Sequence, residues 1–229
     1  MPAALENLFS AIVRDDRMQV ESLLASEPGL GHGRASAARL HTSQICHWLY
    51  VGDTPLHLAA AGYRVEIMRT LLAAGADPRA AANHRHSSPL HYAADTCITE
   101  SVWNPTRQVA AIRCLLAAGA EVDAQDKNGA AALHRAVRTR GAAAVEVLLD
   151  SGCNPTLKNN PGSTPFHLAV QNTGRGGSGD PAAKAAQRQI IRLFIARGIS
   201  DQIRNANGVT VRDSATSQWI RDLLEESRG

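Results

Sequence analysis

Residues 52–60 read GDTPLHLAA, and four later stretches repeat this pattern of a turn followed by a short apolar helix. They are HSSPLHYAA at 86–94, GAAALHRAV at 129–137, GSTPFHLAV at 162–170 and a weaker GVTVRDSA at 208–215. The first four units continue into a second helix that ends in a paired apolar step and a glycine, as in TLLAAGADP at 70–78 and CLLAAGAEVD at 114–123. A turn and two helices therefore form one repeating unit.

The spacing between units locates two insertions. Positions equivalent to Thr54 recur 34, 43, 33 and 46 residues apart. Within a unit, the histidine of the first helix and the second apolar residue of the paired step are 15 residues apart in two units, but 25 and 28 apart in the other two. The extra residues therefore lie between the two helices of their own units, at 97–108 and 173–184.

This unit resembles the ankyrin repeat, which has 33 residues and the signature T-P-L-H-x-A. The resemblance covers nearly the whole chain and implies an all-α solenoid of about six helix pairs with β-turn fingers. We expect a single domain over 1–229, closed by caps near 5–28 and 205–226 with polar outer faces. The first finger, 29–53, is about 15 residues longer than the other connections between repeats.

The signature turn has a physical basis. The threonine hydroxyl caps the following helix, and proline occupies the first helical position, where an N–H is not needed. By resemblance to the family, the signature histidines bond turn backbone and neighbouring repeats; they are His57, His91, His134 and His167. We therefore leave these four out of any catalytic or metal-binding set.

Composition limits the classes of function. The net charge is +3, with 24 basic and 21 acidic residues interspersed, so nucleic-acid binding is not implied. The four cysteines lack disulfide-scaffold or CxxC spacing and are interpreted as reduced thiols. No signal peptide or membrane span is recognised, so we expect a cytoplasmic protein without membrane contact. Sequential stacking buries the core without oligomerisation, so we expect a monomer.

The family resemblance points to the concave face of the first helices as a binding surface. A stripe on that face has a polar and aromatic middle, formed by Tyr92, Asp95, Arg135, Arg138 and Gln171. Either these residues contact a protein or peptide partner, or they form a solvated face with an ion pair between Asp95 and one of the two arginines.

The insertions and the long first finger would wall this groove. Trp48 and Tyr50 belong to the finger, and Trp103 belongs to the insertion 97–108. Exposed tryptophan is costly, so Trp103 either pins its loop onto the helices or contacts a ligand. The alternative is that both insertions are only surface loops.

The second insertion contains GRGGSG at 174–179. It lacks the GK[ST] ending of a P-loop and follows a helix rather than a strand, so nucleotide binding is weakly supported. A loose linker is favoured, with a glycine hinge or an anion contact through Arg175 and Arg138 as the alternative.

Five further histidines lie in the first two fingers: His32, His41, His47, His84 and His86. Their spacing matches no established metal site, so we predict neither a metal nor a cofactor. The leading hypothesis is a noncatalytic protein- or peptide-binding scaffold. The alternative is a small-molecule binding protein or enzyme whose pocket is closed by 97–108 and 173–184. No nucleophile–base pair is recognisable from spacing, so catalysis is less favoured.

Overall fold

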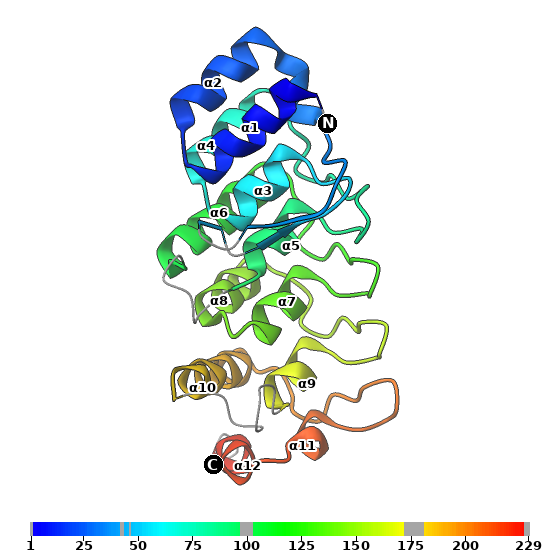
Figure 1. The fold of residues 1–229 in the computed structure, drawn as a ribbon. Helices are drawn as coiled ribbons and strands as arrows, with labels where there is room; N and C mark the ends of the chain where they lie inside the picture. Colours follow the sequence, from blue (N-terminus) through cyan, green and yellow to red (C-terminus); the bar gives the residue numbers. More distant parts are fainter. Residues whose placement is uncertain (1, 42–43, 46, 97–102, 172–180, 227–229) are drawn as a thin grey trace.

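The computed structural model describes residues 2–41, 44–45, 47–96, 103–171 and 181–226. The chain forms an elongated stack of helix pairs, with the first pair at one end and the last pair at the other (Figure 1). The helices are α1 (Ala3–Val13), α2 (Arg17–Ser26), α3 (Pro55–Ala61), α4 (Val65–Ala73), α5 (Pro89–Ala94), α6 (Pro105–Ala117), α7 (Ala132–Arg138), α8 (Ala142–Asp150), α9 (Pro165–Val170), α10 (Pro181–Ala196), α11 (Val211–Ser214) and α12 (Gln218–Glu226).

The helices pack in two layers along the stack. The short first helices α3, α5, α7 and α9 contact one another in sequence, and α4, α6, α8 and α10 form the second layer. The leucine or phenylalanine of each signature turn is buried between neighbouring repeats: Leu56, Leu90, Leu133 and Phe166. Because each repeat buries its apolar face against the next one, the core is continuous along the stack.

The signature turns are built as their sequence predicts. In the first full repeat, Nδ1 of His57 accepts from the backbone N–H of Thr54, and its Nε2 lies 2.9 Å from the carbonyl of Ser87 in the next finger. The other three signature histidines make equivalent contacts to the carbonyls of Ala130, Ser163 and Val209. The structural role expected for these histidines is therefore confirmed.

Part of each insertion lengthens a second helix. Helices α6 and α10 have 13 and 16 residues, whereas α4 and α8 have nine. Residues 105–108 and 181–184 belong to these extensions; 97–102 and 172–180 lie outside the described residues. The insertions are thus not loop throughout, because a proline begins each extended helix at its first position.

The first finger departs from the all-α expectation. After the 3-10 helix η1 (Pro28–His32), it forms an antiparallel hairpin of β1 (Arg39–His41) and β2 (His47–Leu49), in which Leu40 pairs with Trp48. The hairpin crosses in front of the first-helix layer (Figure 1), and β2 contacts α3. The fold is therefore a mostly helical solenoid with a short β-hairpin in one finger.

In the described part of the chain, none of the helices has both the length and the apolar character needed to cross a bilayer. Cys114 and Cys153 are free thiols, as expected, whereas Cys46 and Cys97 lie outside the described residues.

Candidate functional site

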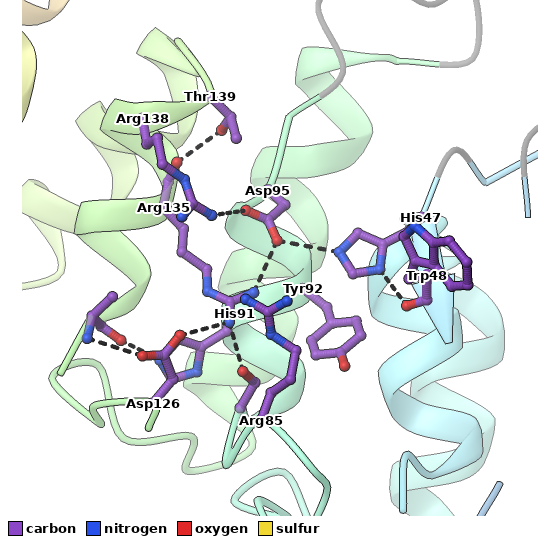
Figure 2. Close-up of polar contacts among 12 residues, drawn as sticks. His47, Trp48, Arg85, His91, Tyr92, Asp95, Asp126, Arg135, Arg138 and Thr139 are labelled. Atoms are coloured by element: carbon purple, nitrogen blue, oxygen red, sulfur yellow. Dashed lines mark hydrogen bonds and ion pairs between the residues drawn. The ribbon is translucent and has the colours of Figure 1, made fainter. Parts of the chain in front are cut away.

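An ion-pair cluster between two neighbouring repeats forms the centre of the site. Asp95 directly follows α5, and Arg135 on α7 donates from Nη1 to its Oδ2 at 2.9 Å. The other terminal nitrogen, Nη2, donates to Oδ2 of Asp126 at 2.8 Å and to Oγ of Ser87 at 2.6 Å. One guanidinium therefore ties together the end of α5 and the two successive fingers that precede α5 and α7 (Figure 2).

The cluster keeps its members charged. Burial alone raises the pKa of Asp95, but the hydrogen bond from His47 and the charge of Arg135 outweigh it and hold this pKa well below its usual range. For Asp126, burial is likewise outweighed by the hydrogen bond from Arg135, and its pKa is lowered. Burial opposes the charge of Arg135, yet the two carboxylates raise its pKa. The two carboxylates and the guanidinium of Arg135 are therefore all charged at neutral pH.

His47 joins the hairpin to this cluster. Its Nε2 lies 3.2 Å from Oδ2 of Asp95, and its Nδ1 lies 2.7 Å from the carbonyl of Trp48. The imidazole also packs on Tyr92, with 4.5 Å between ring centroids. Figure 2 shows His47 and Trp48 on one side of Asp95 and both arginines on the other. The sequence placed His47 only in a set of weak metal candidates, so this contact was missed.

Two residues of the predicted stripe are not on the surface. Tyr92 is 1% exposed and donates its hydroxyl to the carboxylate of Asp53 at 2.7 and 2.9 Å. Burial and the charge of Asp53 raise the pKa of Tyr92 above its usual value. Arg135 is 3% exposed. Their expected exposure is therefore wrong, because the hairpin packs on Tyr92 and the carboxylates enclose Arg135.

Three other predicted residues are exposed. The side chain of Arg138 is 55% accessible, and its Nη2 is 3.9 Å from Oδ1 of Asp95, which is too long for a hydrogen bond. Trp48 is 45% exposed and stacks on Tyr50, with 6.2 Å between ring centroids. Gln171 follows α9 with its side chain in solvent.

A cavity of about 570 Å³ lies beside Arg138. We call it the groove cavity. Helices α7 and α9 and the two finger turns before them contribute its lining: Asp126, Asn128, Ala130, His134, Arg135, Arg138, Asn159, Asn160, Pro161 and Leu168. Its volume is in the range of ligand sites in proteins. The exposed guanidinium of Arg138 therefore borders a cavity that a group of a partner can enter.

Family models match residues 51–83 as an ankyrin repeat and residues 106–200 as three ankyrin repeats, which together span more than half of the chain. The chain belongs to the ankyrin-repeat family. It is also similar in fold to the crystal structure of an ankyrin repeat domain from Acinetobacter baumannii AYE, with a TM-score of 0.70 and 23% identity, covering 96% of this chain and 97% of that chain. Ankyrin repeats are generally protein–protein interaction scaffolds.

The finger turns of this ankyrin-repeat chain also contain a recurring asparagine or aspartate that the sequence analysis did not identify. Five residues before four of the five capping positions stands an asparagine or aspartate whose Oδ1 accepts backbone N–H groups of its own turn: Asn83, Asp126, Asn159 and Asn205. Aligning the fingers as well as the helices would have revealed it. Asp126 is the one charged member of these four, so it pairs with Arg135.

Two glutamines close the ends of the short helices in the repeats with insertions. Nε2 of Gln108 donates to the carbonyls of Ala93 and Asp95, and Nε2 of Gln187 donates to those of Ala169 and Gln171. Carbonyls at a helix end need such donors when they are buried. No single-residue signal in the sequence distinguished these two glutamines from solvent-exposed ones.

Trp103 lies next to the first of these glutamines. Its Nε1 donates to Oε1 of Gln108 at 3.0 Å, and its half-buried ring packs on the core. This arrangement fits the interpretation that Trp103 pins its segment onto the helices. Arg175 lies outside the described residues, as do most of the loop parts of 97–108 and 173–184. A pocket closed by these insertions stays a prediction.

No group of three or more histidine, cysteine, aspartate or glutamate side chains is placed to hold a metal ion within the part of the chain that the structure describes. The titratable groups of the ion-pair cluster are engaged with one another. Chemically, the site offers one accessible guanidinium, finger amides and an apolar wall rather than a reactive pair.

Proposed function

We propose that this protein is a noncatalytic scaffold that binds a protein or peptide partner along its concave groove and fingers. The observation that carries the proposal is a contrast in exposure: Arg138 and Trp48 are exposed, whereas Arg135 is buried and paired with two carboxylates. Because Arg135 and its two carboxylates are already paired before a partner binds, less conformational entropy is lost on binding.

The exposed groups also have the chemistry of interface anchors. Arginine and tryptophan are enriched among the residues that dominate binding energy at interfaces. Trp48 and Arg138 flank Asp95 from opposite sides (Figure 2). Arg138 and Leu168 both line the groove cavity. A partner that follows the groove would contact the hairpin, α7 and α9 in turn.

Site-specific photo-crosslinking tests the proposal. A photoreactive amino acid is placed at Arg138 or Asn128 in the groove, and at the exposed Arg113 of α6 as the control on the second-helix layer. Crosslinking in extracts of the source organism should give a discrete protein adduct from the groove positions only. Equal adducts from Arg113, or none from the groove, would contradict the proposal.

The protein is proposed to act as a monomer, since the helix pairs α1–α2 and α11–α12 lie at the two ends of the stack. Light scattering across a concentration series should give a constant mass near 24.4 kDa. A mass that rises toward twice this value would show self-association instead.

A further inference from the structure

The groove cavity has an unbalanced charge. Among its ionisable lining groups are one acid, Asp126, and two arginines, Arg135 and Arg138. Asp126 is fully engaged, because Oδ1 accepts the N–H groups of Asn128 and Ala130 and Oδ2 accepts from Arg135. The opposite charges of Asp126 and Arg135 therefore offset each other within the lining of the cavity. The remaining charge in the lining is that of Arg138, which among the described residues is balanced only by the more distant carboxylate of Asp95 at 3.9 Å.

Arg138 also has hydrogen-bonding capacity to spare. Within the described residues, its nearest acidic atom is Oδ1 of Asp95 at 3.9 Å, and that oxygen has no hydrogen-bond partner either. The two groups attract each other but do not form the paired geometry of a guanidinium and a carboxylate. A carboxylate entering the cavity would find the planar donor edge of Arg138 available.

The rest of the lining supplies one polar and one apolar surface. The exposed side-chain amide of Asn128 makes no hydrogen bond with any described residue, so its N–H groups are free to donate. Pro161 of the next finger and the half-buried Leu168 of α9 contribute apolar surface. The cavity thus combines one cation, amide donors and an aliphatic surface.

These features select the chemistry of the partner. A phosphate group carries nearly two negative charges and is usually bound by several arginines, but only one guanidinium of the cavity, that of Arg138, is not already hydrogen-bonded to a carboxylate. The backbone of a nucleic acid requires a series of cations, and this groove interleaves its cations with Asp95 and Asp126. A single carboxylate beside an apolar side chain matches what the cavity presents.

We infer that the groove cavity recognises an acidic residue of a partner peptide, with its carboxylate on the guanidinium of Arg138 and a neighbouring apolar side chain against Leu168 and Pro161. This inference rests on the proposed function and narrows it to one class of partner. Arg138 acts as the specificity-determining residue, because arginine binds carboxylate in a bidentate fork that lysine cannot reproduce.

Selection from a random heptapeptide phage library tests the inference. The library is panned against the wild type, Arg138→Glu, and Arg113→Glu, which makes the same change in net charge on the outer face of α6. We expect aspartate or glutamate beside an apolar residue from the wild type and from Arg113→Glu, and lysine or arginine at that position from Arg138→Glu. Identical consensus sequences from all three proteins would overturn the inference.

A quantitative arm uses the peptides selected by the wild type. Changing their acidic residue to its amide, or Arg138 to Gln, should weaken binding at least tenfold by fluorescence anisotropy, and the two changes together should cost little more than one alone. A change of less than twofold in either single substitution would overturn the inference. Circular dichroism and thermal unfolding verify that the variants fold; Arg138 is exposed, so its replacement leaves the core intact.

A blocking variant separates this inference from the proposed function. Asn128→Trp fills the groove cavity from an exposed finger position. Peptides that lose binding to Asn128→Trp but show no acidic preference would refute the carboxylate and leave the groove as the binding surface. Selected peptides that bind Asn128→Trp and the wild type equally, or an absence of enriched peptides, would count against both.

Discussion

Arg135 donates from Nη2 to Oδ2 of Asp126 across 2.8 Å, and the two side chains are only 3% and 2% exposed. The pair joins helix α7 to the finger turn that precedes it. Because Nη1 of the same guanidinium also holds Asp95 of the preceding repeat, the contact fixes a boundary between repeats as well. This charged cluster on the groove side of the stack therefore links neighbouring repeats.

Removal of the shared arginine is predicted to be strongly destabilising. Arg135→Met leaves the buried carboxylate of Asp126 without its counter-ion and removes the guanidinium that is hydrogen-bonded to Asp95, which costs about 3–5 kcal/mol of unfolding free energy. Arg138→Met, three residues along the same helix, should change it by less than about 0.5 kcal/mol, because that side chain is exposed. Urea denaturation at pH 7 measures both. Equal stability of Arg135→Met and the wild type would show that the cluster contributes nothing to the repeat boundary.

The two oxygens of Asp126 have separable roles. Asp126→Asn keeps the Oδ1 acceptor that asparagine supplies at the equivalent position of other fingers, as Asn159 does, and loses only the charge facing Arg135. Asp126→Ala loses the two backbone N–H contacts as well. We expect Asp126→Ala to be the less stable of the two by about 1–2 kcal/mol. Chemical denaturation with a double-mutant cycle against Arg135→Met tests this; identical losses would mean that the turn bonds add no stability.

The glutamines that close the short helices should not tolerate a carboxylate. Gln187→Glu replaces two donated hydrogen bonds with a buried negative charge that faces carbonyl oxygens, at a cost of about 3 kcal/mol or more. Gln189→Glu is the matched control, because it lies on the exposed side of the same helix. The thermal unfolding midpoint should fall for Gln187→Glu and stay nearly constant for Gln189→Glu. A similar midpoint for both would refute the capping role.

Acidification is predicted to destabilise the stack through its signature histidines. Burial, with a smaller contribution from the charge of Arg135, lowers the pKa of His91 from 6.5 to about 4, so folding requires the neutral ring. Above pH 6.5 both states are neutral and the group contributes nothing. As the pH falls from 6.5 toward 4, the unfolded state takes up protons that the folded state excludes, and stability is lost.

At pH 5 this loss for His91 is about 2 kcal/mol. Burial also lowers the pKa of the other three signature histidines, which adds to the trend. Asp95 and Asp126 do not contribute in this window, because their pKa values are lowered and both states are ionised above about pH 5. Urea midpoints at pH 7 and pH 5 measure the effect. His91→Gln, which can still accept from the N–H of Ser88, should have a smaller pH dependence; an unchanged slope would exclude His91 as its source.

Local sequence predicted the repeat geometry because the interactions that define it are local or recur at a fixed period. Thr54 and His57 are three residues apart and meet wherever a helix starts between them. The exposure of Tyr92 was predicted incorrectly, since its helical position implied a solvent-facing stripe and the hairpin residue His47, 45 positions earlier, covers it. The insertions were located by spacing, but the helical extension at 105–108 was not foreseen.

The sequence by itself determined the family, the order of the helix pairs and the position of the signature turns. A periodic pattern of apolar and capping residues buries its apolar faces when successive helix pairs stack in chain order. Only the tertiary structure decided which groove residues are available to a partner. Arg135 and Arg138 occupy similar positions on one helix face, yet one is enclosed by carboxylates from two repeats and the other is exposed to the cavity. That difference arises from contacts between residues as far as 48 positions apart, which no local pattern encodes.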